Sequence, residues 1–348
     1  MIKTKDYKLP CIPQSLILDN PPYFKDLKIN TRENIILNNQ EIKDTITERI
    51  SPFGTHSTLI SLKRSQRPQP TLKDDGTKQK SCLFDNLDEV AKPQRKIGNV
   101  YIAPNPFAFN PGFHDLIITN EHIENIEDIE KDHIRDIINV MFQRAKELSE
   151  EKNVININMG INFGTDKLKF SAGASQPHLH SQIGAIFNGG FSPYFALRKK
   201  IEESFKNIDY TGEYIKAIKS SCLDIKIGKY FILFAPFAPR FKDEIHILPL
   251  NFDIPNLISV TQNQINELIS FIYLTINSFK GENNSKLYIP SFNIIFEGAN
   301  FNEKDNTRIM ISIIPRQSEI AYSELSSRFV IDKFPEDTAK DIKEWIQA

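Results

Sequence analysis

The sequence has few cysteines. It holds three in 348 residues, Cys11, Cys82 and Cys222, and they lie far apart. An odd number of widely spaced cysteines argues against a disulfide framework and is typical of a reducing compartment, so we expect a cytoplasmic protein. No C-x-x-C pair is present, and the sequence therefore offers no obvious zinc site.

Long apolar runs and net charge are also lacking. No run approaches the roughly 20 apolar residues that a membrane-spanning helix needs, and the first ten residues lack the apolar core of a secretory signal. The 43 basic and 44 acidic residues leave a net charge of -1, so no overall basic field is present to hold a nucleic-acid backbone. We therefore expect neither a membrane nor a nucleic acid as partner. Any phosphate recognition should come from a few placed side chains.

Hydrophobic residues make up 40% of the chain and charged residues 25%, which are the proportions of a soluble globular protein. Residues 1–45 are polar and rich in proline, and we interpret them as an N-terminal extension. After strand-like runs at 57–62 and 81–84, hydrophobic periodicity predicts two rounds of similar elements. The first round has strands at 99–103 and 115–118, a helix at 128–152 and strands at 154–160 and 177–187. The second has strands at 231–234 and 244–249, a helix at 262–279 and strands at 292–296 and 308–315, with a closing helix at 335–346.

Because the order of elements repeats, we predict an α+β fold made of two similar units. Each unit should be an antiparallel sheet with a packed helix. The boundaries that follow from the pattern are 46–195 for the first unit and 196–348 for the second.

The segment Ser175–Gln182 carries the chemistry. It reads Ser-Gln-Pro-His-Leu-His-Ser-Gln, and side chains alternate along a strand, so His178, His180 and Gln182 should share one face. An imidazole is a competent nucleophile toward phosphorus when one ring nitrogen is held protonated and the other keeps its lone pair. The small residues at 171–175, just upstream, would let a ligand approach the backbone closely.

Two other interpretations of this segment remain open on the residues alone. One is a polar strand face turned to solvent, with a histidine in a hydrogen-bonding niche. The other is a metal site, because paired histidines on one strand are common metal ligands. No C-x-x-C lies within reach to complete such a site.

The run Gly173–Gln182 resembles the signature of the histidine-triad superfamily, and specifically its transferase branch. That branch contains galactose-1-phosphate uridylyltransferase, ADP-glucose phosphorylase and the dinucleoside tetraphosphate phosphorylases. The hydrolase branch ends the motif in a third histidine, where the transferases have glutamine, as this chain does at Gln182. The resemblance implies two histidine-triad-like repeats, a catalytic one at 46–195 and a degenerate one at 196–348.

Carried over by position, the resemblance makes His180 the residue that becomes nucleotidylated. His178 would orient the nucleophile, and Gln182 would hold the covalent intermediate. Ser175 would contact the phosphates.

Further matches suggest nucleotide contacts elsewhere in the chain. Arg64 and Arg67 stand in an R-x-x-R-P segment that resembles the phosphate-binding segment of uridylyltransferases, and guanidinium groups bind phosphate bidentately. For these two arginines alone, a solvated basic loop is the alternative. The other positions assigned to nucleotide binding are Asp85, Asn86, Asn162, Gly173 and Gln176.

Several features depart from the family pattern. The zinc-binding C-x-x-C of many uridylyltransferases is missing, so we interpret Cys82 as a buried small hydrophobe and His122 as a loop histidine. Segment 307–313 lacks the histidines that hold iron in some relatives. Segment 322–328 stands where relatives often have a glycine-rich turn that contacts the sugar. His246, in the second half, has no partner histidine two residues away, and we interpret it as structural.

The sequence thus predicts a nucleotidylyltransferase. It would move a nucleoside monophosphate from a nucleoside diphosphate sugar, through a covalent nucleotidyl-histidine, to a sugar 1-phosphate or phosphate acceptor. The alternatives are a nucleotide phosphorylase acting on an ADP-sugar or a dinucleoside polyphosphate, and a non-catalytic nucleotide-binding homologue. No cofactor is expected, and a structural zinc has no support in the sequence. Relatives are often dimers, so the resemblance implies a homodimer.

Overall fold

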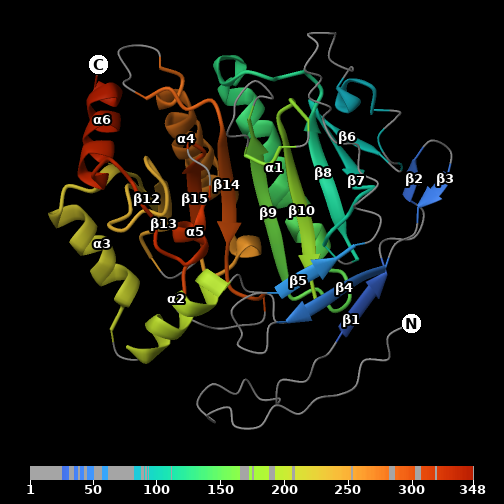
Figure 1. The fold of residues 1–348 in the computed structure, drawn as a ribbon, viewed down its shortest axis with the longest axis horizontal. Coiled ribbons are helices and arrows are strands. Elements are labelled where there is room, and N and C mark those ends of the chain that lie inside the picture. Colours follow the sequence, from blue (N-terminus) through green and yellow to red (C-terminus); the bar gives the residue numbers. More distant parts are fainter. Residues whose placement is uncertain are drawn as a thin grey trace.

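The computed structural model of the chain describes residues 26–30, 35–37, 40–42, 45–50, 57–61, 82–87, 90, 92, 94–110, 112–164, 172–174, 176–187, 193–205, 208–251, 254–281, 287–301, 307–317 and 320–347. Within these residues, ten strands form one antiparallel sheet in the order β11-β12-β13-β15-β14-β9-β10-β8-β7-β6 (Figure 1). Its strands from the first half of the chain are β6 (Arg95–Ile97), β7 (Val100–Pro104), β8 (His114–Thr119), β9 (Asn156–Phe163) and β10 (His180–Ile186). Those from the second half are β11 (Asp224–Ile227), β12 (Phe231–Phe234), β13 (Ile245–Pro249), β14 (Phe292–Glu297) and β15 (Met310–Pro315).

The two halves of the sheet repeat one topology. Strands β6 to β10 and β11 to β15 take the same relative places on either side of the β9–β14 pair. A long helix follows the third strand of each half, α1 (Lys131–Ser149) after β8 and α4 (Gln262–Ser278) after β13. The structure therefore has the predicted order of elements, joined into one continuous sheet, while the domain boundaries stay a prediction.

One face of the sheet is covered by α1 and α4, which pack against each other (Figure 1). Apolar residues of α1 recur at helical spacing and are buried, as Ile134, Ile137, Ile138 and Met141 show. They meet the alternate residues of the strands, such as Ile161, in the main hydrophobic core. Because this packing buries one set of alternate residues in each strand, the other set lies on the opposite face of the sheet.

The opposite face, here called the site face, carries Gln182 and two smaller apolar clusters. The first cluster packs the 3-10 turn η3 (Leu83–Asp85) against the β7 and β8 side of the sheet. The second packs α3 (Tyr210–Ser220) against strands β12, β13 and β15. Polar side chains of the central strands lie between the two clusters, Asn162 on β9 and Asn293 on β14 among them.

The remaining elements lie around this sheet. A three-stranded sheet is formed by β1 (Asp26–Asn30), β4 (Thr45–Ile50) and β5 (Ser57–Ile60), and a hairpin by β2 (Ile35–Leu37) and β3 (Gln40–Ile42). The other helices and turns are η5 (Ile126–Asp128), α2 (Pro193–Ser204), η6 (Leu257–Ser259), α5 (Tyr322–Leu325) and α6 (Pro335–Gln347). Among the described residues, no helix is both long and apolar enough to span a bilayer.

Two strand predictions near the motif are wrong. The described residues of segment 81–84, from Cys82 on, form no strand, because a 3-10 turn begins at Leu83 and buries Phe84. Strand β10 begins at His180 rather than at residue 177, and His178 lies in a bend ahead of it. Helices α2 and α3 were not predicted, because short amphipathic segments between recognisable repeats give a weak periodic signal.

Candidate functional site

His180 is the first residue of β10 and is buried. Its Nδ1 lies 2.7 Å from the backbone carbonyl oxygen of His178. A carbonyl oxygen can only accept a hydrogen bond, so Nδ1 carries the ring proton and Nε2 carries the lone pair. Phe84 packs edge-on against the imidazole, with 5.0 Å between the ring centroids. The ring is therefore held in the tautomer that a nucleophile needs.

Gln182 follows two residues later on the same strand and shares the face of His180. Its Oε1 lies 3.0 Å from Nε2 of His114. Nδ1 of His114 accepts a hydrogen bond from the backbone N–H of Phe109 at 3.1 Å, so the proton of this imidazole is on Nε2 and is donated to Gln182. The carboxamide oxygen of Gln182 is thereby turned to His114, and its NH2 group is directed away from that ring. No sequence pattern indicated His114, which stands 68 residues from Gln182.

His178 and His180 lie on the same face, as strand alternation predicts, because both rings pack against Phe84 while Leu179 between them is buried in the main core. His178 lies just ahead of β10, with its ring beside Cys82 and Asp85 of the η3 region. Its Nε2 donates to the backbone carbonyl of Thr119 at 2.9 Å. Burial lowers the pKa of this imidazole and favours its neutral form.

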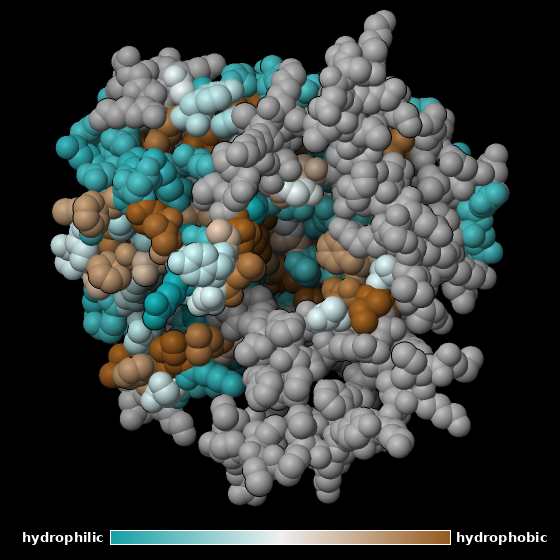
Figure 2. All heavy atoms as spheres, in the orientation of Figure 1, coloured by the Kyte–Doolittle hydropathy of each residue, from teal (hydrophilic) through white to brown (hydrophobic). Residues whose placement is uncertain are grey.

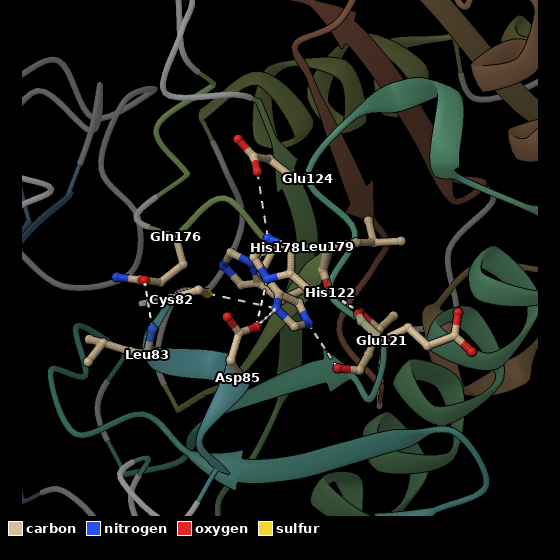
Figure 3. A network of polar contacts seen from close by, with 11 residues as sticks. Cys82, Leu83, Asp85, Glu121, His122, Glu124, Gln176, His178 and Leu179 are labelled. Carbon is tan, nitrogen blue, oxygen red and sulfur yellow. Dashed lines mark hydrogen bonds and ion pairs between the residues drawn. The ribbon is translucent and has the colours of Figure 1, made fainter. Parts of the chain in front are cut away.

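His178 belongs to a cluster of four potential metal ligands (Figure 3). Its members are Cys82, Asp85, His122 and His178, whose ligand atoms all lie within 4.8 Å of one another. Nδ1 of His178 is 3.8 Å from Sγ of Cys82 and 3.6 Å from Oδ1 of Asp85. Nδ1 of His122 is 2.6 Å from the same carboxylate oxygen. The structure thus joins the cysteine and the loop histidine, which the sequence left as isolated residues, into one group.

These four residues fit a zinc ion. Tetrahedral zinc takes cysteine, histidine and aspartate ligands at about 2.0–2.3 Å, which separates the ligand atoms by roughly 3.3–3.8 Å. Ligating histidines usually donate their other ring nitrogen to a carbonyl or carboxylate. His178 does so to Thr119, and Nε2 of His122 lies 3.7 Å from a carboxylate oxygen of Glu124. Asp85 stands three residues after Cys82, where the C-x-x-C pattern would have its second thiol.

Three of the residues predicted to contact nucleotide, Arg64, Arg67 and Ser175, lie outside the described residues. Gly173 has φ +74°, and no atom of the described residues lies within 4 Å of where a Cβ would stand, which would let a ligand approach the backbone there. The Oε1 atom of Gln176 accepts a hydrogen bond from the backbone N–H of Leu83 at 3.2 Å and ties the turn before the motif to η3.

The remaining predicted contacts fall into two places. Asp85 belongs to the metal-ligand cluster, and Asn86 is an exposed residue next to it. Asn162 is the second-last residue of β9, and its Oδ1 accepts a hydrogen bond from Nδ2 of Asn293 at 2.7 Å. Asn293 stands directly opposite it on β14.

The site face is shown in Figure 2, which has a hollow near its centre where hydrophobic and hydrophilic residues meet.

The second half carries buried charge in place of the motif. His246 is buried and donates from Nε2 to Oε1 of Glu244 at 2.9 Å, which Arg240 also contacts at 2.6 Å. Burial alone would raise the pKa of Glu244, but the interactions with His246 and Arg240 lower it to about 2.

Segment 307–313, where no metal ligand was found in the sequence, carries a buried arginine. Arg308 pairs with Asp209 at 2.6 Å. Because Asp209 is also the N-cap of α3, this ion pair fastens α3 to the sheet.

Neither a protein-family model nor a curated protein sequence matches this chain. Several solved structures do. A uridylyltransferase structure is 19% identical, with a TM-score of 0.67 over 86% of this chain and 98% of its own. An ADP-glucose phosphorylase from Arabidopsis thaliana with bound ADP-glucose is 20% identical, with a TM-score of 0.63 over 85% and 98%. A GalT-like protein from the same plant is 22% identical, with a TM-score of 0.62 over 76% and 92%. The chain therefore has the fold of these proteins, which confirms the predicted α+β, histidine-triad-like fold.

Proposed function

We propose that this protein transfers nucleotidyl groups in two displacements, with His180 as the nucleophile. The observation that carries the proposal is the 2.7 Å hydrogen bond from Nδ1 of His180 to the carbonyl of His178. It assigns the ring proton to Nδ1 and the lone pair to Nε2, which is the arrangement that a nucleophilic imidazole requires.

In the first displacement, Nε2 of His180 attacks the α-phosphorus of a nucleoside diphosphate sugar. The N–P bond forms as the bond from that phosphorus to the bridging oxygen breaks, and the sugar 1-phosphate leaves with the electron pair. In the second, a phosphate oxygen of the acceptor attacks the same phosphorus, and Nε2 recovers its lone pair.

Gln182 supports both displacements by its orientation. His114 engages the carboxamide oxygen of Gln182, so its NH2 group is available to a phosphate oxygen on the face that His180 shares. A donor that is already in place when negative charge builds up in the transition state stabilises that state without reorganisation.

We also propose that Cys82, Asp85, His122 and His178 hold a structural zinc ion. When bound, the ion would cross-link the η3 turn to the segment before β10. The carbonyl of His178 orients His180, so residues that hold His178 also hold the nucleophile.

The donor class is a nucleoside diphosphate sugar, and the acceptor is a sugar 1-phosphate or inorganic phosphate. The shared fold with both a uridylyltransferase and an ADP-glucose phosphorylase supports both acceptors as candidates. With inorganic phosphate the same two displacements make the enzyme a phosphorylase, so the product formed identifies which reaction occurs.

Intact-mass measurement after mixing with UDP-glucose, ADP-glucose and GDP-sugars tests the covalent step. We expect one donor to add the mass of its nucleoside monophosphate to the wild-type chain, and His180→Gly to remove the adduct. His133→Ala changes a histidine on α1, away from the motif, and should leave the adduct intact. Tight nucleotide binding with no adduct from any donor would instead identify a non-catalytic binding protein.

A further inference from the structure

Among the described residues, one arginine on the site face has no carboxylate partner. Arg316 follows β15 and is half-buried, and within the described part of the chain no acidic oxygen lies within ion-pair distance of it. Burial alone lowers the pKa of this guanidinium, and no charged neighbour perturbs it. The other largely buried arginines each have a carboxylate partner at 2.6–2.9 Å: Arg144 with Asp115, Arg198 with Glu202, Arg240 with Glu244, and Arg308 with Asp209. A cation kept in this state costs desolvation energy unless a ligand supplies the negative charge.

Neutral groups hold Arg316 in place. Its Nη1 donates to Oδ1 of Asn293 at 3.3 Å, and its guanidinium lies 5.4 Å from the ring centroid of Phe241. Its backbone N–H donates to the carbonyl of Ser291 at 2.8 Å. Within the described residues, Nε of Arg316 and Oγ of Ser291 are both buried without a hydrogen-bond partner. The two donors lie at adjacent strand ends, where the oxygens of one bound anion could accept from both.

A row of side-chain amides connects this arginine to the nucleophile. Nδ2 of Asn293 donates to Oδ1 of Asn162 at 2.7 Å. Asn162 lies one residue beyond Ile161, which pairs with Ser181, so it reaches the end of β9 beside His180. Neighbouring strands are about 4.8 Å apart, which puts Asn293 roughly 10 Å from β10 across the sheet. The Asn293 side chain that accepts from Arg316 thus lies two strands away from His180 on the same face of the sheet.

We propose that Arg316 binds the phosphate that leaves and enters at His180, a sugar 1-phosphate or inorganic phosphate; this rests on the proposed two-step transfer. The guanidinium supplies the counter-charge for that phosphate in both displacements, because the leaving group of the first and the attacking group of the second occupy the same place. Arg316 therefore acts on the second substrate and not on the nucleotide.

The test measures how the nucleotidylated enzyme is discharged. The adduct is formed with the donor, freed of small molecules, and mixed with a series of concentrations of inorganic phosphate, glucose 1-phosphate or galactose 1-phosphate, and loss of the adduct is followed by intact mass. Arg316→Gln should raise the half-saturating acceptor concentration tenfold or more, with the slow discharge by water unchanged. Arg316→Lys should have a half-saturating acceptor concentration between those of wild type and Arg316→Gln, because lysine keeps the positive charge but cannot form the bidentate hydrogen bonds of a guanidinium. The acceptor that saturates at the lowest concentration identifies which phosphate the site binds.

Arg135→Gln is the matched control, because this exposed arginine lies on α1, which packs on the opposite face of the sheet. If Arg316→Gln gave the same dependence on acceptor concentration as wild type, the proposal would be overturned. A merely structural role would lower the melting temperature and leave that dependence unchanged. If wild type formed no adduct, the two-step transfer would fail, and calorimetric titration with inorganic phosphate would still decide on Arg316. Binding lost in Arg316→Gln supports an anion site, and no binding, or equal binding by both proteins, contradicts it.

Discussion

At the scale of single residues, the site depends on which ring nitrogen of each histidine carries the proton. Backbone groups decide this for three of them. His180 and His178 donate to carbonyl oxygens, and His114 accepts from a backbone N–H. Backbone groups do not titrate, so these tautomers are kept as long as the local fold is kept.

The pair His114 and Gln182 gives a prediction at this scale. His114→Phe removes the hydrogen bond that orients the carboxamide, so adduct formation in a single turnover should slow by roughly 10-fold to 100-fold, about as much as in Gln182→Ala. The double variant should be no slower than the slower single one, because both changes remove the same oriented donor. Rapid quench with mass detection measures the rates. Fully multiplicative losses would mean that the two residues act independently.

At the scale of elements, the site is assembled from three separate segments. The η3 turn brings Cys82 and Asp85, the loop after β8 brings His122, and the segment before β10 brings His178. The backbone hydrogen bond of Leu83 to the Gln176 side chain is one of the protein's own ties between these segments. A metal ion would add a second tie at the same place.

We therefore predict that the purified protein contains about one equivalent of zinc. Asp85→Ala should lower the zinc affinity at least tenfold and the melting temperature by several degrees, and Asp85→Cys should recover binding by restoring a C-x-x-C pair. Elemental analysis and thermal melts with and without a chelator measure both. Glu151→Ala, which changes an exposed carboxylate after α1, serves as the control. Equal metal content in wild type and Asp85→Ala would count against the site.

At the scale of the whole molecule, the two halves are joined through the β9–β14 pair. Gly160 stands at this seam opposite Ile295. A Cβ at Gly160 would lie 2.6 Å from the carbonyl oxygen of Ile294, which belongs to the backbone and cannot swing aside. Close approach of the two strands thus depends on the absence of a side chain at this position.

Gly160→Ala should therefore lower the free energy of unfolding by about 1–3 kcal/mol, because the strands must separate or shift to admit the methyl group. Urea denaturation followed by circular dichroism measures the loss. Lys226→Ala, on the edge strand β11, is exposed and should change stability by less than about 0.5 kcal/mol. If the urea midpoint of Gly160→Ala were the same as that of wild type, strands β9 and β14 would not need to be so close for stability.

The sequence by itself determined the elements and the chemical identity of the motif. Hydrophobic periodicity is a local property, so the two rounds of strands and helices and the long helices α1 and α4 could be predicted from it. The fold predicted from the Gly173–Gln182 signature is the one observed. The roles of His180 and Gln182 came from the same signature, and they stay a proposal that the adduct experiment tests.

Only the tertiary structure decided what surrounds that motif. Cys82 meets His178 across 96 residues and His114 meets Gln182 across 68. That Arg316 has no carboxylate partner among the described residues, whereas Arg144 and Arg308 each have one, is visible only in the tertiary structure. His178 and His180 both contact Phe84 of η3, and alternation along the strand does not show which segment covers that face. Contacts of this kind follow from sheet register and packing between distant segments, which local patterns do not specify.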